Sequence, residues 1–308
     1  MFDIAVILIN YNSTEHTINC VNSIIEKTTQ NISYQIIITD NCSEKDEYLK
    51  LKSYCDSLQN GTIKLYRNSI NAGFGAGNMF GLQFANAHYY AFVNNDTLFI
   101  NDCLSILKTA LDNNPNIGIA GAQAFKENGD FMISLDHFAS PTREILGRNF
   151  LEIINSKKYP KRKKTYQNTI QVNFVPGSFM FVRVNDFNEV GGFDTNIFLY
   201  YEETDLCIRL SKIVKHAYLV PEAEFIHFHG ASTPRSMAIK KELKISLLYI
   251  IRKHYGFWGH FSVSSFLTLK YFFSSILKPK NWALFYLLIN GASLSKSLKT
   301  KQKIVTIS

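Results

Sequence analysis

Residues 4–9 read IAVILI, and residues 10–12, directly after them, read NYN. An apolar run without polar alternation is typical of a strand that is buried on both faces. Strands of this kind belong to largely parallel sheets, in which helices cover both sides. The first dozen residues therefore predict an α/β fold, with a polar loop at the carboxyl end of its first strand.

The rest of the N-terminal half continues with apolar strands and longer helical segments. Apolar residues recur at helical spacing after the first strand, and Ser13 or Thr14 is the expected N-cap. The expected strands cover residues 34–39, 63–66, 89–93, 117–124 and 179–182, and the expected helices cover 17–25, 44–58, 76–87, 102–113 and 203–214. This alternation predicts a mostly parallel central sheet that is flanked by helices.

Polar residues follow three of the expected strands at the point where each strand ends. They are residues 10–12 (NYN), 40–41 (DN) and 94–96 (NND). Asn and Asp are common in turns, so each cluster alone is most simply explained as a turn. Open α/β sheets bind ligands beyond the carboxyl ends of their strands, so three successive clusters also fit one shared site. Both interpretations are open at this point.

Composition favours a folded protein with free thiols. The chain has 308 residues, of which 46% are apolar and 19% charged, and its mean hydropathy is −0.05. These values allow a sizeable core and argue against a polytopic membrane protein. No basic and then apolar leader precedes the first strand, so a cytoplasmic location is expected. Five scattered cysteines without a C-x-x-C pair argue against a disulfide framework or a zinc ribbon.

The net charge of +8 is concentrated towards the C-terminus. Residues 236–308 contain twelve Lys or Arg residues and a single acid, Glu242, whereas residues 1–235 carry a net charge of −3. We therefore expect two regions, a catalytic domain over 1–235 and a basic, aromatic-rich helical region over 236–308. The basic region has neither a helix-turn-helix pattern nor an aromatic RNA-binding motif, so no nucleic-acid partner is expected.

Within the basic region, residues 237–255, 261–277 and 282–289 are expected to be helical. Lys270 interrupts the second stretch and the third is short, so both lack the ~20 apolar residues that span a bilayer. Aromatic residues beside lysines favour helices that lie in the interface of an anionic membrane. The alternative is a helical hairpin that packs on the catalytic domain.

Two further stretches have a distinctive composition. Residues 71–78 read NAGFGAGN, which resembles a dinucleotide-binding fingerprint but has Phe80 where that pattern needs glycine. Its glycines still allow a ligand or a helix to approach the backbone closely. Residues 156–166 contain six basic residues and predict a loop, which is either simply solvated or in contact with phosphate.

Three groups of residues have side chains suited to catalysis. Asp96 follows an apolar strand and offers a carboxylate to Mg²⁺ or Mn²⁺, hard ions that prefer oxygen ligands. Glu202 and Glu203 open a helix, where acids either interact with the helix dipole or include a general base. His227 and His229 are two residues apart on an expected strand and so share one face, from which an imidazole can join a metal site.

The ordered set of these motifs resembles the family-2 glycosyltransferases of the GT-A fold. The closest similarity is to the rhamnosyltransferase-like branch that builds bacterial surface polysaccharides such as O-antigen and capsule. The resemblance covers residues 4 to about 233. The matching stretches are residues 6–13 (VILINYNS), 38–43 (ITDNCS), 71–78 (NAGFGAGN), 92–96 (FVNND), 176–182 (PGSFMFV) and 191–209, which begins GGFD.

The resemblance implies a donor pocket and a metal site. Asp40 is expected to contact the nucleotide base, and Asp96 takes the last position of the family's D-x-D-like metal motif. Asn94 replaces the first acid of that motif, so one carboxylate remains. The other expected donor-site residues are Asn10, Tyr11, Asn71, Gly73, Phe74, Asn78 and Asn95.

The resemblance also implies a base and a metal-site histidine. Glu203 stands where the family usually has its base Asp, and Glu202 is the rival. Glu is one methylene longer than Asp, so its reach differs. His227 matches the histidine that helps to hold metal and diphosphate, with His229 as the alternate.

By resemblance, the chain is expected to be an inverting glycosyltransferase that acts by single displacement with Mg²⁺ or Mn²⁺. The expected donor is dTDP-L-rhamnose, with a UDP-hexose as the alternative. The expected acceptor is a growing glycan or a polyprenyl-diphosphate-linked sugar, at the inner face of the cytoplasmic membrane. The basic region would hold the protein there peripherally. A different class is also open, a non-catalytic nucleotide-sugar-binding scaffold, which Asn94 and the Glu-for-Asp exchange at Glu203 favour.

Overall fold

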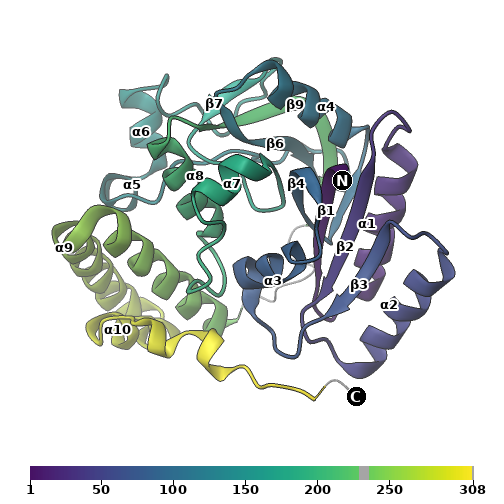
Figure 1. The fold of residues 1–308 in the computed structure, drawn as a ribbon. Coiled ribbons are helices and arrows are strands. Elements are labelled where there is room, and N and C mark those ends of the chain that lie inside the picture. The colour runs from purple at the N-terminus through teal and green to yellow at the C-terminus, as the bar shows by residue number, and fades with distance from the viewer. Residues whose placement is uncertain (229–235, 307–308) are drawn as a thin grey trace.

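The computed structural model describes residues 1–228 and 236–306, in which one mixed sheet forms the centre of an α/β fold (Figure 1). The sheet order is β3-β2-β1-β4-β8-β6-β9-β5, and β7 pairs with β9 beside this path. The strands are β1 (Phe2–Asn10), β2 (Tyr34–Asp40), β3 (Ile63–Arg67), β4 (Ala87–Asn94), β5 (Thr97–Phe99), β6 (Ile117–Phe125), β7 (Ile170–Val172), β8 (Phe179–Arg183) and β9 (His216–His227).

The parallel arrangement expected from the sequence forms the N-terminal half of the sheet. β2 and β4 flank β1, and β3 extends the sheet beyond β2, all in parallel pairs. In the C-terminal half, β8 runs antiparallel between β4 and β6, while β6 and β9 pair in parallel. β5 and β7 are antiparallel to β9. The sheet as a whole is mixed because the chain after β6 returns to its middle through β8.

Helices cover both faces of the sheet. α1 (Thr14–Lys27), α2 (Lys45–Ser57) and α4 (Cys103–Asn113) pack on one face, and α3 (Gly73–Leu82), α7 (Val184–Glu189) and α8 (Glu202–Lys212) pack on the other. In β1, Ile4, Val6 and Leu8 point into the first core, whereas Ala5 and Ile7 point into the second. Burying one large aliphatic side chain contributes about 1.5–3 kcal/mol. The apolar run that opens the chain is therefore stable only between two layers of helices.

Most expected element boundaries hold within a few residues, and α3 is the clearest exception. It covers Gly73–Leu82 instead of 76–87, and Ala87 already belongs to β4, where it pairs with Phe2. The helix begins early because Gly73 takes a φ of +82°, which glycine adopts without a steric cost. The short helices α5 (Pro141–Leu146) and α6 (Arg148–Ile154) lie in a stretch where the sequence pattern was too loose to predict them.

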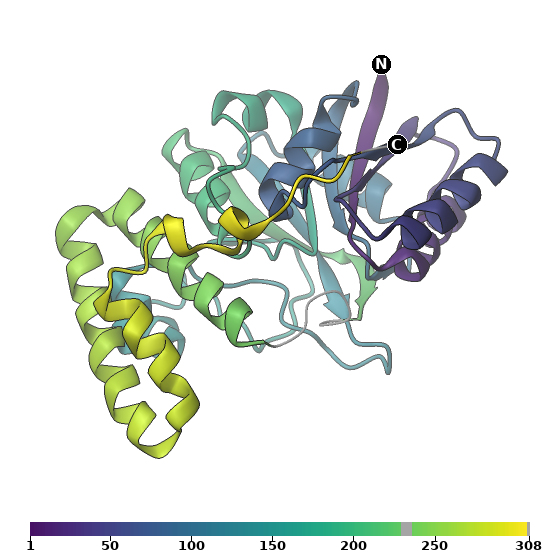
Figure 2. The same ribbon diagram turned by 90° about the horizontal axis from the view of Figure 1, so that it is seen from below.

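The C-terminal region is helical, as expected. α9 (Met237–Leu277) breaks at Gly256, whose φ of +67° separates one helical segment from the next. The second segment and α10 (Trp282–Ile289) form a hairpin that extends from the side of the molecule (Figure 2). Three short 3₁₀ turns accompany it, η1 (Pro279–Asn281), η2 (Leu294–Lys296) and η3 (Leu298–Lys301). None of the helices within residues 1–228 and 236–306 combines the length and apolar character needed to cross a membrane.

The first segment of α9 packs on the catalytic part of the chain. Ile245, Leu248 and Ile251 share a buried cluster with Ala139 and Ile197, which lie before β9 in the chain. The inner side of the hairpin joins the same cluster through Val263, Leu267 and Leu287, as the packed alternative expected, while its outer side keeps exposed apolar side chains.

A buried carboxylate fastens the end of the chain to the same helix. Glu242 is 1% exposed, and its two carboxylate oxygens accept hydrogen bonds from the Ser297 hydroxyl and the Leu298 backbone N–H, both at 2.7 Å. From there the chain returns across the catalytic part, where the Val305 N–H donates to the carbonyl of Ser69 at 2.8 Å (Figure 2). The acid that stands out in the basic region is thus a structural anchor.

Candidate active site

The three polar clusters predicted at strand ends lie together. Asn10 of β1 is in register with Asp40 of β2, and the preceding residue, Ile9, is in register with Asn94 of β4. The Asn10 side-chain amide donates to the Asp40 carboxylate at 3.0 Å, so two of the clusters are directly bonded. Adjacent parallel strands bring their carboxyl ends to one edge of the sheet. The clusters therefore lie together along one surface edge of the sheet, and their use as a shared site stays a prediction.

Asp40 is part of the framework of that surface. Its side chain is fully buried, and its carboxylate accepts hydrogen bonds from Asn10 and from the backbone N–H of Ser43. The Arg67 guanidinium lies 3.5 Å from the same carboxylate. These groups cover the side chain in this conformation, and its expected contact with a nucleotide base stays a prediction. Tyr11, one residue beyond Asn10, is 42% exposed and offers an aromatic face instead.

Asn41 and Asn71 tie the end of β2 to the start of α3. The Asn41 amide donates to the Asn71 side-chain oxygen at 3.0 Å and to the Gly73 carbonyl at 3.1 Å. The Asn41 oxygen accepts from the Ala72 N–H. Asn41 was not among the predicted site residues. Its position directly after Asp40, at the end of a strand, could have indicated that it belongs to the site. Asn71, which was predicted, organises the loop through these bonds.

The glycines of residues 71–78 allow close packing between protein elements. A Cβ at Gly73 would overlap the carbonyl oxygen of Phe198, which accepts a hydrogen bond from the Phe74 N–H. A Cβ at Gly75 would lie 3.3 Å from Phe193 and 3.5 Å from the Glu202 side chain. The glycine run therefore brings α3 against the segment that leads into α8. Of the two uses considered for these glycines, the structure shows the close approach of a helix.

Three other predicted donor-site residues are also occupied by internal contacts. Phe74 packs edge-on against Phe193, and Asn78 is buried and donates to the Phe74 carbonyl. Asn95 is 5% exposed, and its amide donates to the hydroxyls of Ser13 at 2.6 Å and Thr17 at 2.8 Å. These contacts engage all three side chains within the protein, and their expected contact with the donor stays a prediction. Residue type alone could not reveal this, because burial depends on tertiary contacts.

Asp96 and His227 come together across the sheet. β5 and β9 are antiparallel with Thr97 opposite His227, and this register leaves the Asp96 carboxylate 3.3 Å from the imidazole Nε2. Two ligands of one octahedral ion, each about 2.1 Å from the metal, lie about 3 Å apart. The pair therefore fits a divalent cation that is shared with a phosphate ligand. In the part of the chain that the structure describes, no group of three or more His, Cys, Asp or Glu side chains is placed to hold a metal ion, and His229 lies outside the described residues.

Glu202 and Glu203 are presented by an unusual turn. Tyr200 and Tyr201, directly before them, have φ angles of +74° and +73°. Residues other than glycine occupy this left-handed region at a cost and mainly where the surrounding structure requires it. The turn brings the first residues of α8 against α3, with the Glu202 side chain beside Gly75. Strained backbone of this kind clusters at functional sites.

Burial changes the protonation of both glutamates. Burial, with the neighbouring Glu203 as a second cause, raises the pKa of Glu202 well above its ordinary value. Glu202 is 2% exposed, and its Oε1 has no hydrogen-bond partner within residues 1–228 and 236–306. Burial also raises the pKa of Glu203 to about 7, with Asp136 raising it further and Arg143 opposing. Glu202 is therefore held neutral, whereas Glu203 can exchange a proton near neutral pH.

A network of ion pairs supports the side of the site that Glu203 faces. Arg143 of α5 lies 5.7 Å over the Tyr201 ring and donates to the carbonyl of His137. Asp136 pairs with Arg148 at 2.8 Å and with Arg162 at 3.5 Å. Residues 156–166 form an irregular loop, as expected, and Arg162 is the member of it that turns inward. Among its basic residues, Lys157, Lys158, Lys161, Lys163 and Lys164 are exposed.

Comparisons with known proteins agree with this architecture. Residues 5–191 match the family model described as Glycosyl transferase family 2. Rhamnosyltransferase WbbL of Escherichia coli (strain K12) is 29% identical over 244 residues, which cover 74% of this chain and 88% of WbbL. The N-acetylglucosaminyl-diphospho-decaprenol L-rhamnosyltransferase of Mycobacterium tuberculosis (strain CDC 1551 / Oshkosh) is 36% identical over 89 residues, 28% of this chain and 29% of that protein.

Two solved structures share the fold. GalNAc-T7 with UDP, GalNAc and Mn²⁺ superposes with a TM-score of 0.64 and 15% identity over 94% of this chain, which spans about half (55%) of that chain. The mannosyltransferase PcManGT from Pyrobaculum calidifontis, in complex with GDP-Man and Mn²⁺, gives a TM-score of 0.58 and 11% identity over 96% of this chain and 89% of its own. These neighbours show the GT-A fold, and the match over residues 5–191 places the chain in glycosyl transferase family 2.

Proposed function

We propose that this glycosyltransferase moves L-rhamnose from dTDP-L-rhamnose to a lipid-linked or growing surface glycan, with inversion at the anomeric carbon. Support for the sugar comes from the likeness to WbbL, which extends over most of both chains. Support for a lipid-linked acceptor comes from the mycobacterial relative, whose name specifies N-acetylglucosaminyl-diphospho-decaprenol.

The observation that carries the chemistry is the state of Glu203 at the start of α8. A general base is most effective when its pKa lies near the working pH, and burial raises the pKa of Glu203 to about 7. In the proposed step, the acceptor oxygen bonds to the anomeric carbon and the bond from that carbon to the diphosphate oxygen breaks. The acceptor's proton goes to Glu203. Glu202, neutral and packed on α3, would position this end of the helix.

The pocket would bind the nucleotide at the shared edge of β1, β2 and β4. Tyr11 is exposed there and would stack on the base, while Asn10, Asp40 and Asn71 would hold the loops that surround it. Asn95 would act in the same indirect way, through its bonds to α1. In this proposal, the shape of the base pocket depends on hydrogen bonds that hold the surrounding loops in place.

Asp96 and His227 would hold a divalent metal, Mg²⁺ or Mn²⁺. When bound, the ion would supply positive charge to the departing nucleotide diphosphate. The chain itself offers one carboxylate and one imidazole, because Asn94 stands at the other motif position. Metal affinity is therefore expected to depend strongly on the diphosphate of the donor as a further ligand.

The protein is proposed to work peripherally at the cytoplasmic face of the membrane that carries its acceptor. The hairpin presents large exposed apolar side chains, among them Phe273, Ile276 and Leu277, beside Lys278 and Lys280. Apolar side chains next to Lys favour the interface of an anionic membrane.

A donor panel tests the proposal. The full chain is incubated with dTDP-L-rhamnose, UDP-glucose or UDP-N-acetylglucosamine, with Mn²⁺ or with excess chelator, and both thermal stability and nucleotide release are measured. A bound donor stabilises by mass action, so dTDP-L-rhamnose with Mn²⁺ is expected to raise Tm most and to be the donor that is consumed. If a UDP-sugar is preferred, it replaces dTDP-L-rhamnose as the proposed donor. Binding of a donor without any turnover would favour the non-catalytic scaffold.

A further inference from the structure

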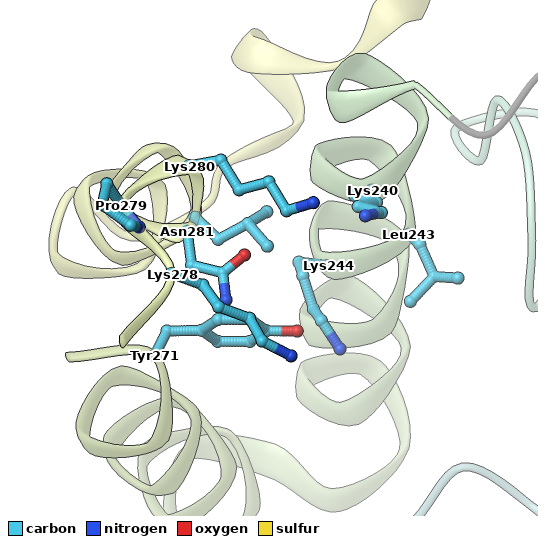
Figure 3. A pocket seen from close by; sticks show the side chains of 9 residues that line it. Lys240, Leu243, Lys244, Tyr271, Lys278, Pro279, Lys280 and Asn281 are labelled. Atoms are coloured by element: carbon cyan, nitrogen blue, oxygen red, sulfur yellow. The ribbon is translucent and has the colours of Figure 1, made fainter. Parts of the chain in front are cut away.

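The hairpin and the first segment of α9 enclose a cavity of about 780 Å³ that the catalytic site does not use. Its lining side chains come from both segments of α9, from η1 and from α10 (Figure 3). They are Lys240, Leu243, Lys244, Tyr271, Lys278, Pro279, Lys280, Asn281 and Leu284. We call this cavity the lysine groove.

The lysine groove concentrates positive charge, and its lining contains four lysines. Lys240 and Lys244 reach in from one wall, and Lys278 and Lys280 reach in from the opposite turn (Figure 3). No carboxylate lines the groove, and none of these four lysines forms an ion pair with the described part of the chain. Ammonium groups that converge in this way repel one another, so an anion between them is stabilised by several charge-assisted hydrogen bonds.

Two contacts fix the groove in shape. The Lys244 ammonium lies 5.6 Å over the Tyr271 ring, which joins the two segments of α9. The Asn281 amide donates to the Ser274 hydroxyl at 2.7 Å, which holds the turn that carries Lys278 and Lys280. Burial also lowers the pKa of Lys244, and the nearby cations Lys270 and Arg143 lower it further, while Glu144 opposes them.

The groove and the start of α8 share a neighbouring cation, Arg143. Arg143 of α5 lies over the Tyr201 ring, two residues before Glu203, and its charge also contributes to the lowered pKa of Lys244. Exposed apolar side chains continue from the other end of the groove along the hairpin. They are Leu269, Phe272, Phe273, Ile276 and Leu277 of α9 and Tyr286 and Ile289 of α10.

We propose that the lysine groove binds the diphosphate of a polyprenyl-diphosphate-linked acceptor, whose hydrocarbon chain follows the exposed apolar side of the hairpin. The phosphates meet the four lysines, the apolar chain meets the apolar surface, and the sugar lies towards Glu203. This inference rests on the proposed function, because it assigns a binding site to the acceptor of that reaction. It makes the hairpin a substrate-binding element as well as a membrane contact.

Vesicle binding with the full-length protein tests the assignment. Phosphatidylcholine vesicles contain either a small fraction of polyprenyl diphosphate or enough phosphatidylglycerol to give the same surface charge. We expect the wild-type protein to bind the polyprenyl diphosphate vesicles at least tenfold more tightly. The double variant Lys278→Gln/Lys280→Gln, on an exposed turn, is expected to lose this preference, and Lys244→Gln is expected to weaken it.

The matched control is Lys64→Gln/Lys212→Gln, which removes two exposed, unpaired charges from β3 and α8. It should keep the preference. Equal binding of the wild type to both vesicles would overturn the proposal, as would a Lys278→Gln/Lys280→Gln variant that keeps the preference.

A kinetic comparison separates this inference from the proposed function. In Lys278→Gln/Lys280→Gln, KM for a lipid-linked acceptor is expected to rise about tenfold or more, while kcat and the Tm increase with dTDP-L-rhamnose stay as in the wild type. An unchanged KM overturns the groove assignment. If the wild type neither binds nor consumes dTDP-L-rhamnose, the proposed function fails. The vesicle experiment still shows whether the groove binds polyprenyl diphosphate.

Discussion

At the scale of single residues, the protonation of Glu203 decides whether the chain can act as a base near neutral pH. Burial raises its pKa to about 7. The active form is the carboxylate, so kcat is expected to rise with pH and to level off above that value. Glu203→Gln is expected to lower kcat by roughly 10²–10⁴-fold while leaving donor binding intact. Initial rates across a pH series, with donor thermal shifts as the control, check this.

The neighbouring glutamate provides the comparison. Glu202→Gln keeps the neutral state that burial already imposes, so it should leave the pH profile unchanged. If Glu202→Gln is inactive while Glu203→Gln keeps nearly full activity, then Glu202 is the base and Glu203 is not.

The same raised pKa predicts a change in stability. The native state of Glu203 holds its proton more tightly than the unfolded state, so stability falls as pH rises from about 4.5 towards 7. Glu203→Gln mimics the protonated form, and its Tm at pH 8 is therefore expected to exceed that of the wild type. Calorimetry at pH 5 and pH 8 measures the difference, and equal shifts at both values would contradict the burial of this carboxylate.

Asp96 is expected to be required for metal-assisted donor binding. It supplies the carboxylate of the pair with His227, and Asn94 offers no second one. Asp96→Asn should weaken the Mn²⁺-dependent binding of dTDP by about tenfold or more, because an amide is a poorer ligand for a hard ion. Calorimetric titration of dTDP with Mn²⁺ and with chelator checks this. Binding of wild-type protein that is equally tight in chelator would remove the metal from the proposal.

At the scale of elements, apolar runs predicted β1, β2 and β4 because strands buried on both faces need no long-range information to be recognised. The order of β8 and β9 in the sheet was not predictable in this way, since it depends on pairings between residues that are distant in sequence. The same limit applies to Asp40 and Asn95. Their residue types suggested ligand contacts, while their burial follows from Arg67, Ser13 and Thr17 in other elements.

The start of α3 gives a direct test of the glycine run as a packing device. A side chain at Gly73 requires a φ near +82° and overlaps the Phe198 carbonyl. Gly73→Ala is therefore expected to destabilise by about 2–4 kcal/mol, the sum of backbone strain and steric repacking. Gly129 has the same backbone conformation, φ +81°, but open space around its Cβ position. Gly129→Ala should cost only about 1–2 kcal/mol, and urea unfolding of both variants isolates the packing contribution.

At the scale of the whole molecule, Asp205 joins the catalytic part to the first segment of α9. Its carboxylate is fully buried and lies 2.7 Å from Lys253 and from His254, while Arg209 pairs with it from α8. Burial opposes ionisation, but the hydrogen bond with His254 and the charges of Arg209 and Lys253 outweigh it and lower the pKa of Asp205 to about 2. Its contribution to stability is therefore complete above the unfolded value near 4 and is lost as pH falls towards 2.

Removing this carboxylate leaves the buried side of Lys253 and Arg209 without the anion that they share. Asp205→Asn is expected to destabilise the protein by about 3–5 kcal/mol at pH 7, and the difference from wild type should shrink below pH 4. Asp130→Asn is the control, because Asp130 pairs with Lys126 at 3.1 Å on the surface and should contribute less than about 1 kcal/mol. Similar unfolding curves for both variants would show that the first segment of α9 is not held through Asp205. Such a result would also favour the proposal that residues 1–235 and 236–308 are separate domains.

The outer surface of the hairpin determines how the whole molecule meets a membrane. Phe273, Ile276 and Leu277 are 62%, 62% and 84% exposed, and inserting them into the interface would bury apolar area that water now covers. Each such side chain contributes about 1.5–3 kcal/mol when buried, and this contribution does not depend on salt, whereas the attraction of the lysines does. High salt is therefore expected to weaken the binding of the wild type to anionic vesicles without abolishing it. Phe273→Ser/Ile276→Ser/Leu277→Ser is expected to bind at low salt only.

A matched variant on the catalytic part controls for the loss of apolar surface. Ile153, Ile154 and Val214 are 81%, 63% and 69% exposed and lie outside the hairpin, so replacing all three by Ser should leave vesicle binding unchanged. Each of the two triple variants is tested by co-flotation with phosphatidylglycerol vesicles, once at low salt and once at high salt. Equal behaviour of the two triple variants would assign membrane contact to another surface. A wild-type protein that stays unbound at low salt would remove the peripheral membrane proposal, since neither the twelve basic residues of the C-terminal region nor its exposed aromatic side chains would then be sufficient for binding.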